Sequence, residues 1–451
     1  MTGPGVRWTA EQVLALAPDA ASRRAGGRLA AAGPWSEAGS SGGGAVWGLC
    51  KGSGSKPYQT VVDTTGPACA CSCPSRKFPC KHALGLLLLW ASETDAVRDG
   101  TAPEWAEQWL AGRRGRAEQE RAPEGRGRPD GAAAPDAARR RAERRAARIT
   151  AGALELEQRL ADLLRGGLAS AEQAGYGLWE ETAARMVDAQ APGLAARVRE
   201  LGSIPGTGPG WPVRLLEECA LLHLLDSAWL GRELLPAPLA ATVRTRVGLT
   251  APADGAPVRD RWLVLAQYDS SDGKVTTRRA WVYGQGSGRF ALLLSYGAAG
   301  RAPQLALPVG AAVEAELVPY GGAGQLRAEL REGSWVPAPV EGPPRGGPVS
   351  AALDAYGHAL AEDPWLDSWP VTLTDVVPVP TPDGHNWQLA DSAGESALPL
   401  TQVALSRPGL WKLVALSGGG PVTVFAECGQ AGVTPLAAWS AATGSETVPL
   451  V

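Results

Sequence analysis

The chain has 451 residues, of which 45% are hydrophobic, and a formal net charge of -3 at neutral pH. This length predicts two to four domains, each able to bury a proper hydrophobic core. A net charge so close to zero excludes a globally basic nucleic-acid-binding protein, so any contact with phosphates must be local. The longest apolar run, around residues 84–90, is far shorter than the roughly 20 residues that span a membrane, so we expect no membrane domain.

The first 63 residues predict two short helices and a hairpin. Helical spacing of apolar residues appears at 10–16 and 20–31. Residues 45–50 and 58–63 are typical of strands, and the Gly- and Ser-rich stretch between them predicts a turn. The N-terminus lacks the basic segment and apolar stretch of a signal peptide, so we expect a cytoplasmic chain with reduced cysteines.

Four side chains that bind soft metals follow directly after this hairpin. They are Cys71, Cys73, Cys80 and His82. A residue two positions on in a helix points about 200° around the axis, so neither Cys-x-Cys nor Cys-x-His can share a metal inside a regular helix. Both pairs must therefore lie on turns or at a helix edge. Pro74 and Pro79 flank the loop between them and favour a rigid turn there.

The mixed set of thiols and imidazole indicates zinc. Seven cysteines leave one unpaired in any scheme of disulfides alone. An iron–sulfur cluster would use a further nearby cysteine, whereas thiolates with one imidazole at this spacing fit zinc better. Four protein ligands leave no open position for water, so we expect one structural zinc ion.

The pattern C-x-C-x6-C-x-H, in the text CPSRKFPCKHALGLLL, resembles the SWIM zinc finger, a small ββα-like module. The resemblance covers only the segment around residues 45–95 and implies the four ligands named above. Cys69 leaves an alternative open, because Cys69 with Cys71 could form the first pair and leave Cys73 spare. Cys73 followed by Pro74 matches the family pattern better, so we favour Cys71 with Cys73.

What the resemblance implies about function is binding to DNA or to a protein. Proteins similar to this longer bacterial form are associated with MoxR-type ATPases and von Willebrand A-domain proteins, which implies an adaptor role.

Basic residues gather on the hairpin and the metal loop, where only Asp63 opposes them. They are Lys51, Lys56, Arg76, Lys77 and Lys81. Cations beside a rigid element can contact phosphates, which is the sequence-independent part of nucleic-acid binding. A solvated face, or a site for an acidic protein, would have the same composition. Phe78 in this loop suits either stacking on a base or filling the gap below the loop.

Residues 112–135 have the composition of a basic Gly/Ala/Pro linker. Six arginines with one counter-charge, Glu143, come next: Arg139, Arg140, Arg141, Arg144, Arg145 and Arg148. They predict either a basic helix on a nucleic-acid backbone or the exposed start of the following helix.

Residues 136–246 predict a helical domain. Apolar residues recur at helical spacing in residues 178–189, 194–201 and 211–230. His223 lies among leucines in the last of these segments, so we expect a buried core histidine rather than a ligand.

From residue 247 the apolar period changes to that of strands. A first β-rich domain at 247–336 is expected to hold strands at 261–268, 275–283 and 290–296. After a Pro/Gly linker at 337–349, residues 350–451 predict a leading helix at 350–361 and a second β-rich segment. The strands expected in this second segment are 370–379, 386–389, 410–416 and 422–426.

Together these features predict an α+β multidomain protein. Its parts are residues 1–111 with a small ββα-like zinc-binding module, a central helical domain and a C-terminal β-rich region. We expect Cys80→Ser to disorder the module while sparing the other domains, since each has its own apolar seams.

The β half contains no paired carboxylates, nucleophile elbow, phosphate loop or catalytic triad, so we expect no enzyme, and no small-molecule substrate is identified. The leading hypothesis is a zinc-dependent interaction protein that binds DNA or a protein partner. The alternative is a protein-only adaptor without nucleic-acid contact.

Overall fold

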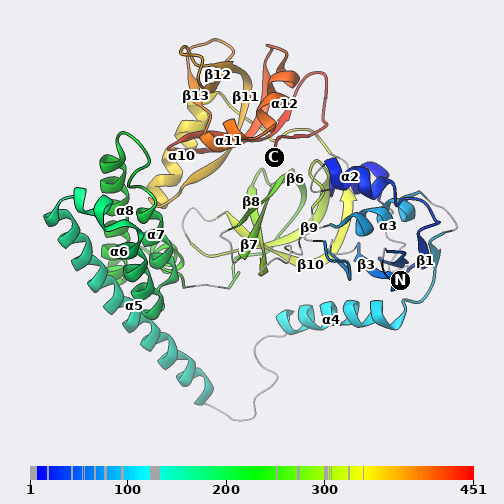
Figure 1. Ribbon diagram of the computed structural model, residues 1–451, viewed down its shortest axis with the longest axis horizontal. Coiled ribbons are helices and arrows are strands. Elements are labelled where there is room, and N and C mark those ends of the chain that lie inside the picture. Colours follow the sequence, from blue (N-terminus) through cyan, green and yellow to red (C-terminus); the bar gives the residue numbers. More distant parts are fainter. Residues whose placement is uncertain are drawn as a thin grey trace.

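The computed structural model describes residues 8–17, 20–41, 44–52, 54, 56–64, 68–75, 79–92, 96–121, 133–249, 252–271, 275–298, 303, 305, 307–322, 326–338 and 340–451. Three lobes surround a central β-barrel (Figure 1). An N-terminal sheet with helices lies on one side of the barrel, a helical bundle on the other, and a C-terminal sheet above it. The mixed helices and sheets confirm the α+β multidomain class.

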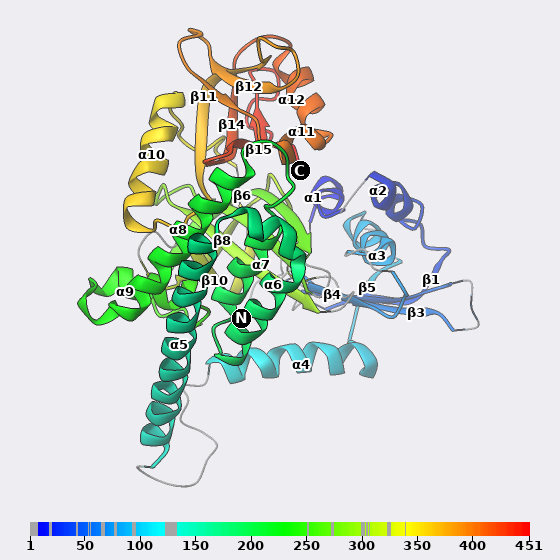
Figure 2. The ribbon, with the colours of Figure 1, turned by 60° about the vertical axis from the view of Figure 1, so that its left-hand side comes forward.

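The N-terminal sheet has the order β4-β3-β2-β1-β5. Its strands are β1 (Trp35–Ser40), β2 (Ala45–Cys50), β3 (Tyr58–Asp63), β4 (Ala68–Cys71) and β5 (Arg98–Asp99). The two strands expected from sequence are β2 and β3, which pair antiparallel. On one face lie α1 (Ala10–Ala15), α2 (Ala20–Gly27) and α3 (Lys81–Ala91), while α4 (Glu104–Arg121) lies against the other (Figure 2).

Helix α4 extends into the segment expected to be a linker. It continues from 112 to Arg121, and the next helix begins at Ala133. Trp105 and Trp109 pack against the N-terminal sheet, and Arg113 lies 3.4 Å from Asp63. The residues beyond this anchor are mainly Arg, Ala, Glu and Gln, which are strong helix formers, so continuing the helix costs little.

The bundle consists of α5 (Ala133–Gly166), α6 (Ala169–Asp188), α7 (Pro192–Gly202), α8 (Trp211–Leu230), a 3₁₀ turn (Arg232–Leu234) and α9 (Ala237–Arg246). Its core includes Leu156, Met186, Leu222 and Trp229. A Cβ added at Gly152 would lie 2.6 Å from that of Ala189, so the glycine lets α5 approach the end of α6 closely. The first half of α5 projects beyond the bundle (Figure 1).

His223 is not the buried core histidine expected from its leucine neighbours. Its side chain is 61% exposed, and its Nδ1 lies 2.6 Å from a carboxylate oxygen of Glu157 on α5. The residues of α8 that are buried, Leu222 and Leu225 among them, follow the helical period, and position 223 falls off that stripe.

One turn further along α8, the carboxyl group of Asp226 is fully buried. Neither of its carboxylate oxygens has a hydrogen-bond partner among the described residues. Burial, followed by the neighbouring Glu157 carboxylate, raises the pKa of Asp226 to about 8. The neutral acid avoids a buried negative charge beside that of Glu157, so the folded bundle holds this proton at neutral pH.

The barrel contains β6 (Val258–Ser271), β7 (Val275–Gly284), β8 (Phe290–Ala298), β9 (Ala312–Pro319) and β10 (Arg327–Ala338). The first three strands form an antiparallel meander. Strand β9 then pairs with β6, and β10 closes the barrel by pairing antiparallel with β9 and parallel with β8.

The interior of the barrel and the N-terminal module form one hydrophobic core. Val264 and Val282 inside the barrel belong to the same buried cluster as Leu87 of α3 and Val13 of α1. The module therefore shares its main core with the barrel, which differs from the separate apolar seams expected from sequence.

The C-terminal lobe has the sheet order β13-β12-β11-β14-β15-β16, with α10 (Val349–Glu362) leading into it. Its strands are β11 (Ser368–Pro380), β12 (Trp387–Asp391), β13 (Ala397–Pro399), β14 (Val422–Gly429), β15 (Gly432–Trp439) and β16 (Val448–Pro449). Two helices, α11 (Gln402–Ser406) and α12 (Gly409–Ser417), lie between β13 and β14.

Helix α12 corrects the strand expected at 410–416. Pro408 precedes it with φ -60°, and Gly418 ends it in the left-handed conformation with φ 53°. Proline at the start and glycine just past the end are helix boundary signals. The short apolar run between them fits either a strand or a helix by composition, so the boundaries decide.

Specific polar contacts fix the C-terminal lobe to its neighbours. Glu427 of β14 accepts hydrogen bonds of 2.8 Å from the Tyr268 hydroxyl and from the Trp281 indole, both on the barrel. On the side of the bundle, Arg246 pairs at 2.7 Å with Asp363, a residue only 1% exposed. The lobes are thus docked through buried groups rather than joined only by the chain.

None of the helices within the described ranges is long and apolar enough to cross a membrane.

The proton on Asp226 predicts how stability changes with pH. Its folded pKa is raised from 3.8, so the folded state binds the proton more tightly than the unfolded state does. The stability from this proton is complete below about pH 4 and is lost as pH rises towards 8. Asp226→Asn should therefore weaken the fall in melting temperature between about pH 5 and pH 8, measured by circular dichroism.

Asp162→Asn is the matched control, because Asp162 is exposed and paired with Arg165. It should keep the pH dependence of the unaltered protein. Equal pH dependence of the Asp226→Asn variant and the unaltered protein would contradict a buried, protonated Asp226.

Candidate metal centre

The four predicted ligands come from a strand end, a turn and a helix start. Cys71 is the last residue of β4 and pairs with Thr60 of β3, and Cys73 follows on the turn. Cys80 is the N-cap of α3, with extended φ and ψ of -73° and 166°, and His82 lies in the first helical turn. Both short pairs therefore lie outside regular helix geometry, as their spacing requires.

The structure brings these ligand atoms together. The three sulfurs and one ring nitrogen lie within 4.8 Å of one another. His82 Nδ1 is 3.7 Å from Cys71 Sγ and 4.0 Å from Cys80 Sγ. Cys80 and His82 are buried, while Cys71 and Cys73 are partly exposed.

These separations fit one tetrahedral zinc ion. With bonds of about 2.3 Å to sulfur and 2.0 Å to nitrogen, the ligand atoms of a tetrahedron lie about 3.5–3.8 Å apart. The distances from His82 Nδ1 are close to that range and need only a small contraction. The residues present therefore fit a closed site with three thiolates and one imidazole, positioned to hold a single zinc ion.

Without a metal, the thiols of Cys71 and Cys80 have pKa values shifted in opposite directions. A hydrogen bond from Cys80, with further ones from His82 and Thr60, lowers the pKa of Cys71 to about 4. The same interaction with Cys71, followed by burial, raises the pKa of Cys80. Three thiols this close cannot all ionise without a cation between them, so zinc binding must release protons from this cluster.

Residues around the ligands hold them in place. The Thr60 hydroxyl lies 3.2 Å from Cys71 Sγ. The His82 ring packs on Tyr58 with centroids 4.9 Å apart. Such supporting contacts orient metal ligands and tune their basicity.

The alternative ligand Cys69 is placed elsewhere. It is 8% exposed and belongs to the shared hydrophobic core, and it is not part of the four-residue metal group. Burial raises the pKa of the Cys69 thiol, which disfavours the thiolate that a metal requires.

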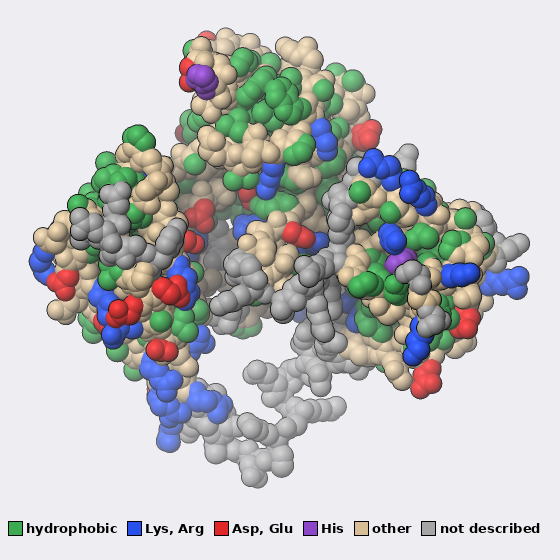
Figure 3. All heavy atoms as spheres, viewed as in Figure 1, with side chains coloured by type: hydrophobic (Ala, Val, Ile, Leu, Met, Phe, Trp, Pro, Cys, Tyr) green, Lys and Arg blue, Asp and Glu red, His purple; other side chains and the backbone are tan. Residues whose placement is uncertain are grey.

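Three of the five basic residues singled out in the sequence can be placed. Lys51 and Lys56 lie on the connection between β2 and β3, and Lys81 is the first residue of α3. All three are exposed. Arg76 and Lys77, with Phe78, lie outside the described residues. Lys and Arg side chains are spread over this lobe in Figure 3, at the right of the view.

The arginine-rich segment forms the projecting part of α5, and its charge covers the lower tip of the bundle in Figure 3. Arg139 pairs with Glu143, and Arg145 donates to the Gly248 carbonyl. The remaining four, all exposed, have no carboxylate partner among the described residues: Arg140, Arg141, Arg144 and Arg148. The segment is thus the exposed start of a helix, and its charges are available to an anion.

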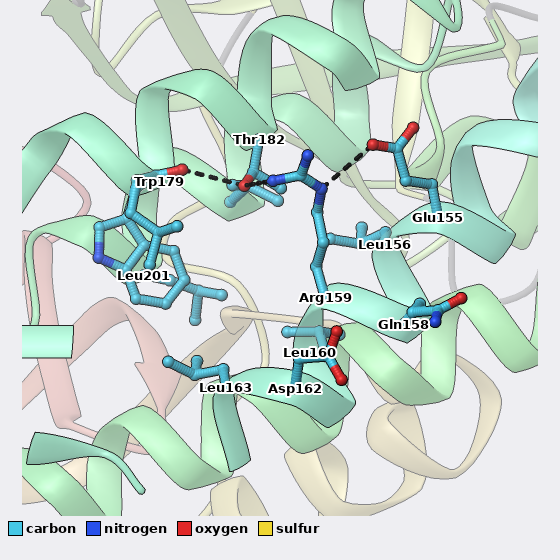
Figure 4. A pocket seen from close by; sticks show the side chains of 12 residues that line it. Glu155, Leu156, Gln158, Arg159, Leu160, Asp162, Leu163, Trp179, Thr182 and Leu201 are labelled. Atoms are coloured by element: carbon cyan, nitrogen blue, oxygen red, sulfur yellow. Dashed lines mark hydrogen bonds and ion pairs between the residues drawn. The ribbon is translucent and has the colours of Figure 1, made fainter. Parts of the chain in front are cut away.

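A pocket of about 520 Å³ opens between α5, α6 and α7 (Figure 4). Leucine side chains and Trp179 make up much of its lining. Arg159 at its edge is held by Glu155 at 3.1 Å and by the Thr182 hydroxyl at 3.3 Å.

Models of known protein families match two parts of the chain. A model for the SWIM zinc finger matches residues 58–91. A model for the SWIM-associated four-helix bundle domain matches residues 144–247. The first range contains the four ligands, and the second covers the bundle from the middle of α5 to the end of α9. No curated protein and no solved structure matches the chain.

Removing one ligand should release the metal and loosen two lobes together. Cys80→Ser is expected to lose the single zinc ion measured by elemental analysis. Because α3 shares its core with the barrel, amide hydrogen exchange should rise in β2, β3 and the barrel strands. The bundle has a separate core and should keep its protection.

Cys69→Ala is the control, and it should retain one zinc ion per chain. Loss of zinc from this variant, or faster exchange in the bundle than in the barrel for Cys80→Ser, would contradict the site and the shared core.

Proposed function

For a chain that carries a SWIM zinc finger and the associated four-helix bundle, we propose the function of a non-enzymatic interaction protein that binds DNA. In this proposal the zinc ion is structural and the basic surface beside it contacts the phosphate backbone. The metal supplies no reactive position, because all four ligands come from the protein.

The observation that carries this proposal is the exposure of Lys51, Lys56 and Lys81 on the lobe that holds the metal site. Lys51 directly follows β2, and Lys81 is the first residue of α3. Zinc with three thiolates leaves one net negative charge, which a single lysine offsets. The surplus positive charge supports contact with phosphates.

The arginines of α5 support the same class of partner. Arg141, Arg144 and Arg148 follow one another at intervals of three and four, so they share one face of the helix. Alanine accompanies them, and this stretch has no large apolar residue that could anchor a folded protein partner. A phosphate backbone needs no such anchor.

A protein-only adaptor is the second candidate, favoured by an exposed aromatic pair. Trp411 on α12 is 64% exposed and packs edge-on against Trp387 with centroids 5.8 Å apart. Exposed tryptophan is a common anchor of protein interfaces. For this candidate we propose a MoxR-type ATPase or a von Willebrand A-domain protein as the partner, as the family resemblance implies.

DNA binding at the module makes a direct prediction. Lys51→Glu, Lys56→Glu and Lys81→Glu combined should weaken binding to a short DNA duplex at least tenfold at low salt. Charge reversal both removes contacts and adds repulsion, and the dependence of affinity on salt should become shallower by about 0.9 per lost contact. Fluorescence anisotropy over a salt series measures both.

Lys412→Glu is the control, since Lys412 is exposed on the C-terminal lobe. It should leave the affinity and the salt dependence unchanged. Equal affinities of the triple variant and the unaltered protein for the DNA duplex would contradict DNA binding by the module.

The adaptor candidate is tested by Trp411→Ala. If a protein partner docks on this lobe, the variant should lose a stoichiometric partner in pull-downs while keeping its zinc and its melting temperature. A partner retained at full stoichiometry would exclude the Trp411 surface as the contact.

A further inference from the structure

The central barrel has an architecture that can present a ligand-binding face. It is closed from five strands in the order β10-β8-β7-β6-β9, with one parallel pair between β8 and β10. A five-stranded barrel in which a meander is closed by two strands from outside it is the arrangement of the OB-fold. In such barrels the surface of the second and third strands, here β7 and β8, binds oligonucleotides or oligosaccharides.

Part of this surface is already covered by the C-terminal lobe. Phe425 of β14 packs against Trp281 of β7 at 6.2 Å and against Phe290 of β8 at 5.6 Å between ring centroids. At the other end of the same face, no ring contact with the C-terminal lobe is found among the described residues. There Thr277 of β7 pairs with Tyr296 of β8, and the Tyr296 side chain is 55% exposed.

A second tyrosine lies at the closing strand of the barrel. Tyr320 follows β9, and the guanidinium of Arg327 on β10 stacks over its ring at 4.3 Å. Burial, and beyond it Glu329 and Tyr296, raises the pKa of Tyr320, an effect that Arg327 opposes. Arg327 pairs with Leu292 of β8, the strand that carries Tyr296, so the Tyr320–Arg327 pair lies beside the β7–β8 face.

A further cation lies on β7. Arg279 pairs with Leu294 of β8, two residues before Tyr296. Its Nε is buried and has no hydrogen-bond partner among the residues that the structure describes. The Arg279 side chain as a whole is partly exposed, and a guanidinium can donate hydrogen bonds from its terminal nitrogens to a phosphate oxygen.

We propose that the end of the β7–β8 face that carries the exposed Tyr296 binds single-stranded nucleic acid. Tyr296 and Tyr320 stack on successive bases, and Arg327 and Arg279 contact the phosphates between them. Base stacking on aromatic side chains beside a positive surface is the usual basis of sequence-tolerant single-strand binding. This site is separate from the lysines beside the zinc ion and does not rest on DNA binding there.

The charges favour nucleic acid over the other ligand class of such barrels. Oligosaccharides also stack on aromatic rings but carry no phosphate to balance two guanidinium groups. A duplex keeps its bases stacked on each other, so it cannot use Tyr296 and Tyr320 in this way.

The test uses the full-length protein with zinc bound and a fluorescent oligothymidine of about 16 nucleotides, the upper end of the site size of one such barrel. Tyr296→Ala and Tyr320→Ala should each weaken binding by roughly 5- to 150-fold in anisotropy measurements. Tyr296→Phe and Tyr320→Phe should bind as the unaltered protein does, because the stacking ring remains.

Trp411→Ala is the matched control, since it removes an equally exposed aromatic ring from another lobe. It should leave the affinity unchanged. The proposal is overturned if the unaltered protein does not bind, if Tyr296→Ala binds normally, or if the control loses as much affinity.

A crosslinking measurement keeps the test independent of how well the variants fold. An oligonucleotide containing bromodeoxyuridine, irradiated on the unaltered protein, should crosslink to peptides containing Tyr296 or Tyr320. Crosslinks confined to the zinc module would overturn the barrel site and leave the proposed module function standing. Crosslinks at the barrel, together with unchanged duplex affinity in the variant with Lys51, Lys56 and Lys81 replaced by Glu, would support the barrel site and contradict the proposed module function.

Discussion

The closure of four ligand atoms around one cation is the constraint on which the N-terminal half depends. It ties the end of β4 to the start of α3, and α3 is buried at every position from His82 to Trp90. A helix that is apolar on all sides must be covered on all sides. The sheet covers one side, while α1, α2 and the barrel interior complete the enclosure. Zinc thus fixes the helix that joins the module to the barrel.

This shared core changes how the protein divides into parts. The module and the barrel unite through their apolar residues, and the barrel joins the C-terminal sheet around Phe425 and Glu427. The bundle core takes in Trp365 from the segment between α10 and β11, and Arg246 of the bundle pairs with the buried Asp363. A change at the metal should therefore affect the barrel before it affects the bundle.

Much of the metal site could be predicted from the sequence because its four ligands lie close together along the chain. The spacing of Cys71, Cys73, Cys80 and His82 excludes regular helix and leaves one geometry for a shared ion. The hairpin of β2 and β3, which precedes the metal site, could be predicted equally well from its strand patterns. In contrast, the choice between Cys69 and Cys73 depended on which side chain the core would bury.

The errors came where local pattern competes with boundaries or with tertiary contacts. Residues 410–416 are a helix because Pro408 and Gly418 bound them, a signal that the apolar composition obscured. His223 is exposed because the buried stripe of α8 passes through Leu222 and Leu225. The closure of the barrel by β9 and β10 depends on pairing between distant strands, which no single stretch of sequence records.

The most direct test of the central claim is X-ray absorption at the zinc edge on the purified protein, together with the zinc content. The account predicts one zinc ion per chain with three sulfur ligands at about 2.3 Å and one nitrogen ligand at about 2.0 Å. An oxygen ligand in place of a sulfur would indicate an open site. Absence of zinc from correctly folded protein would contradict the claim that the ion holds the module and the barrel together.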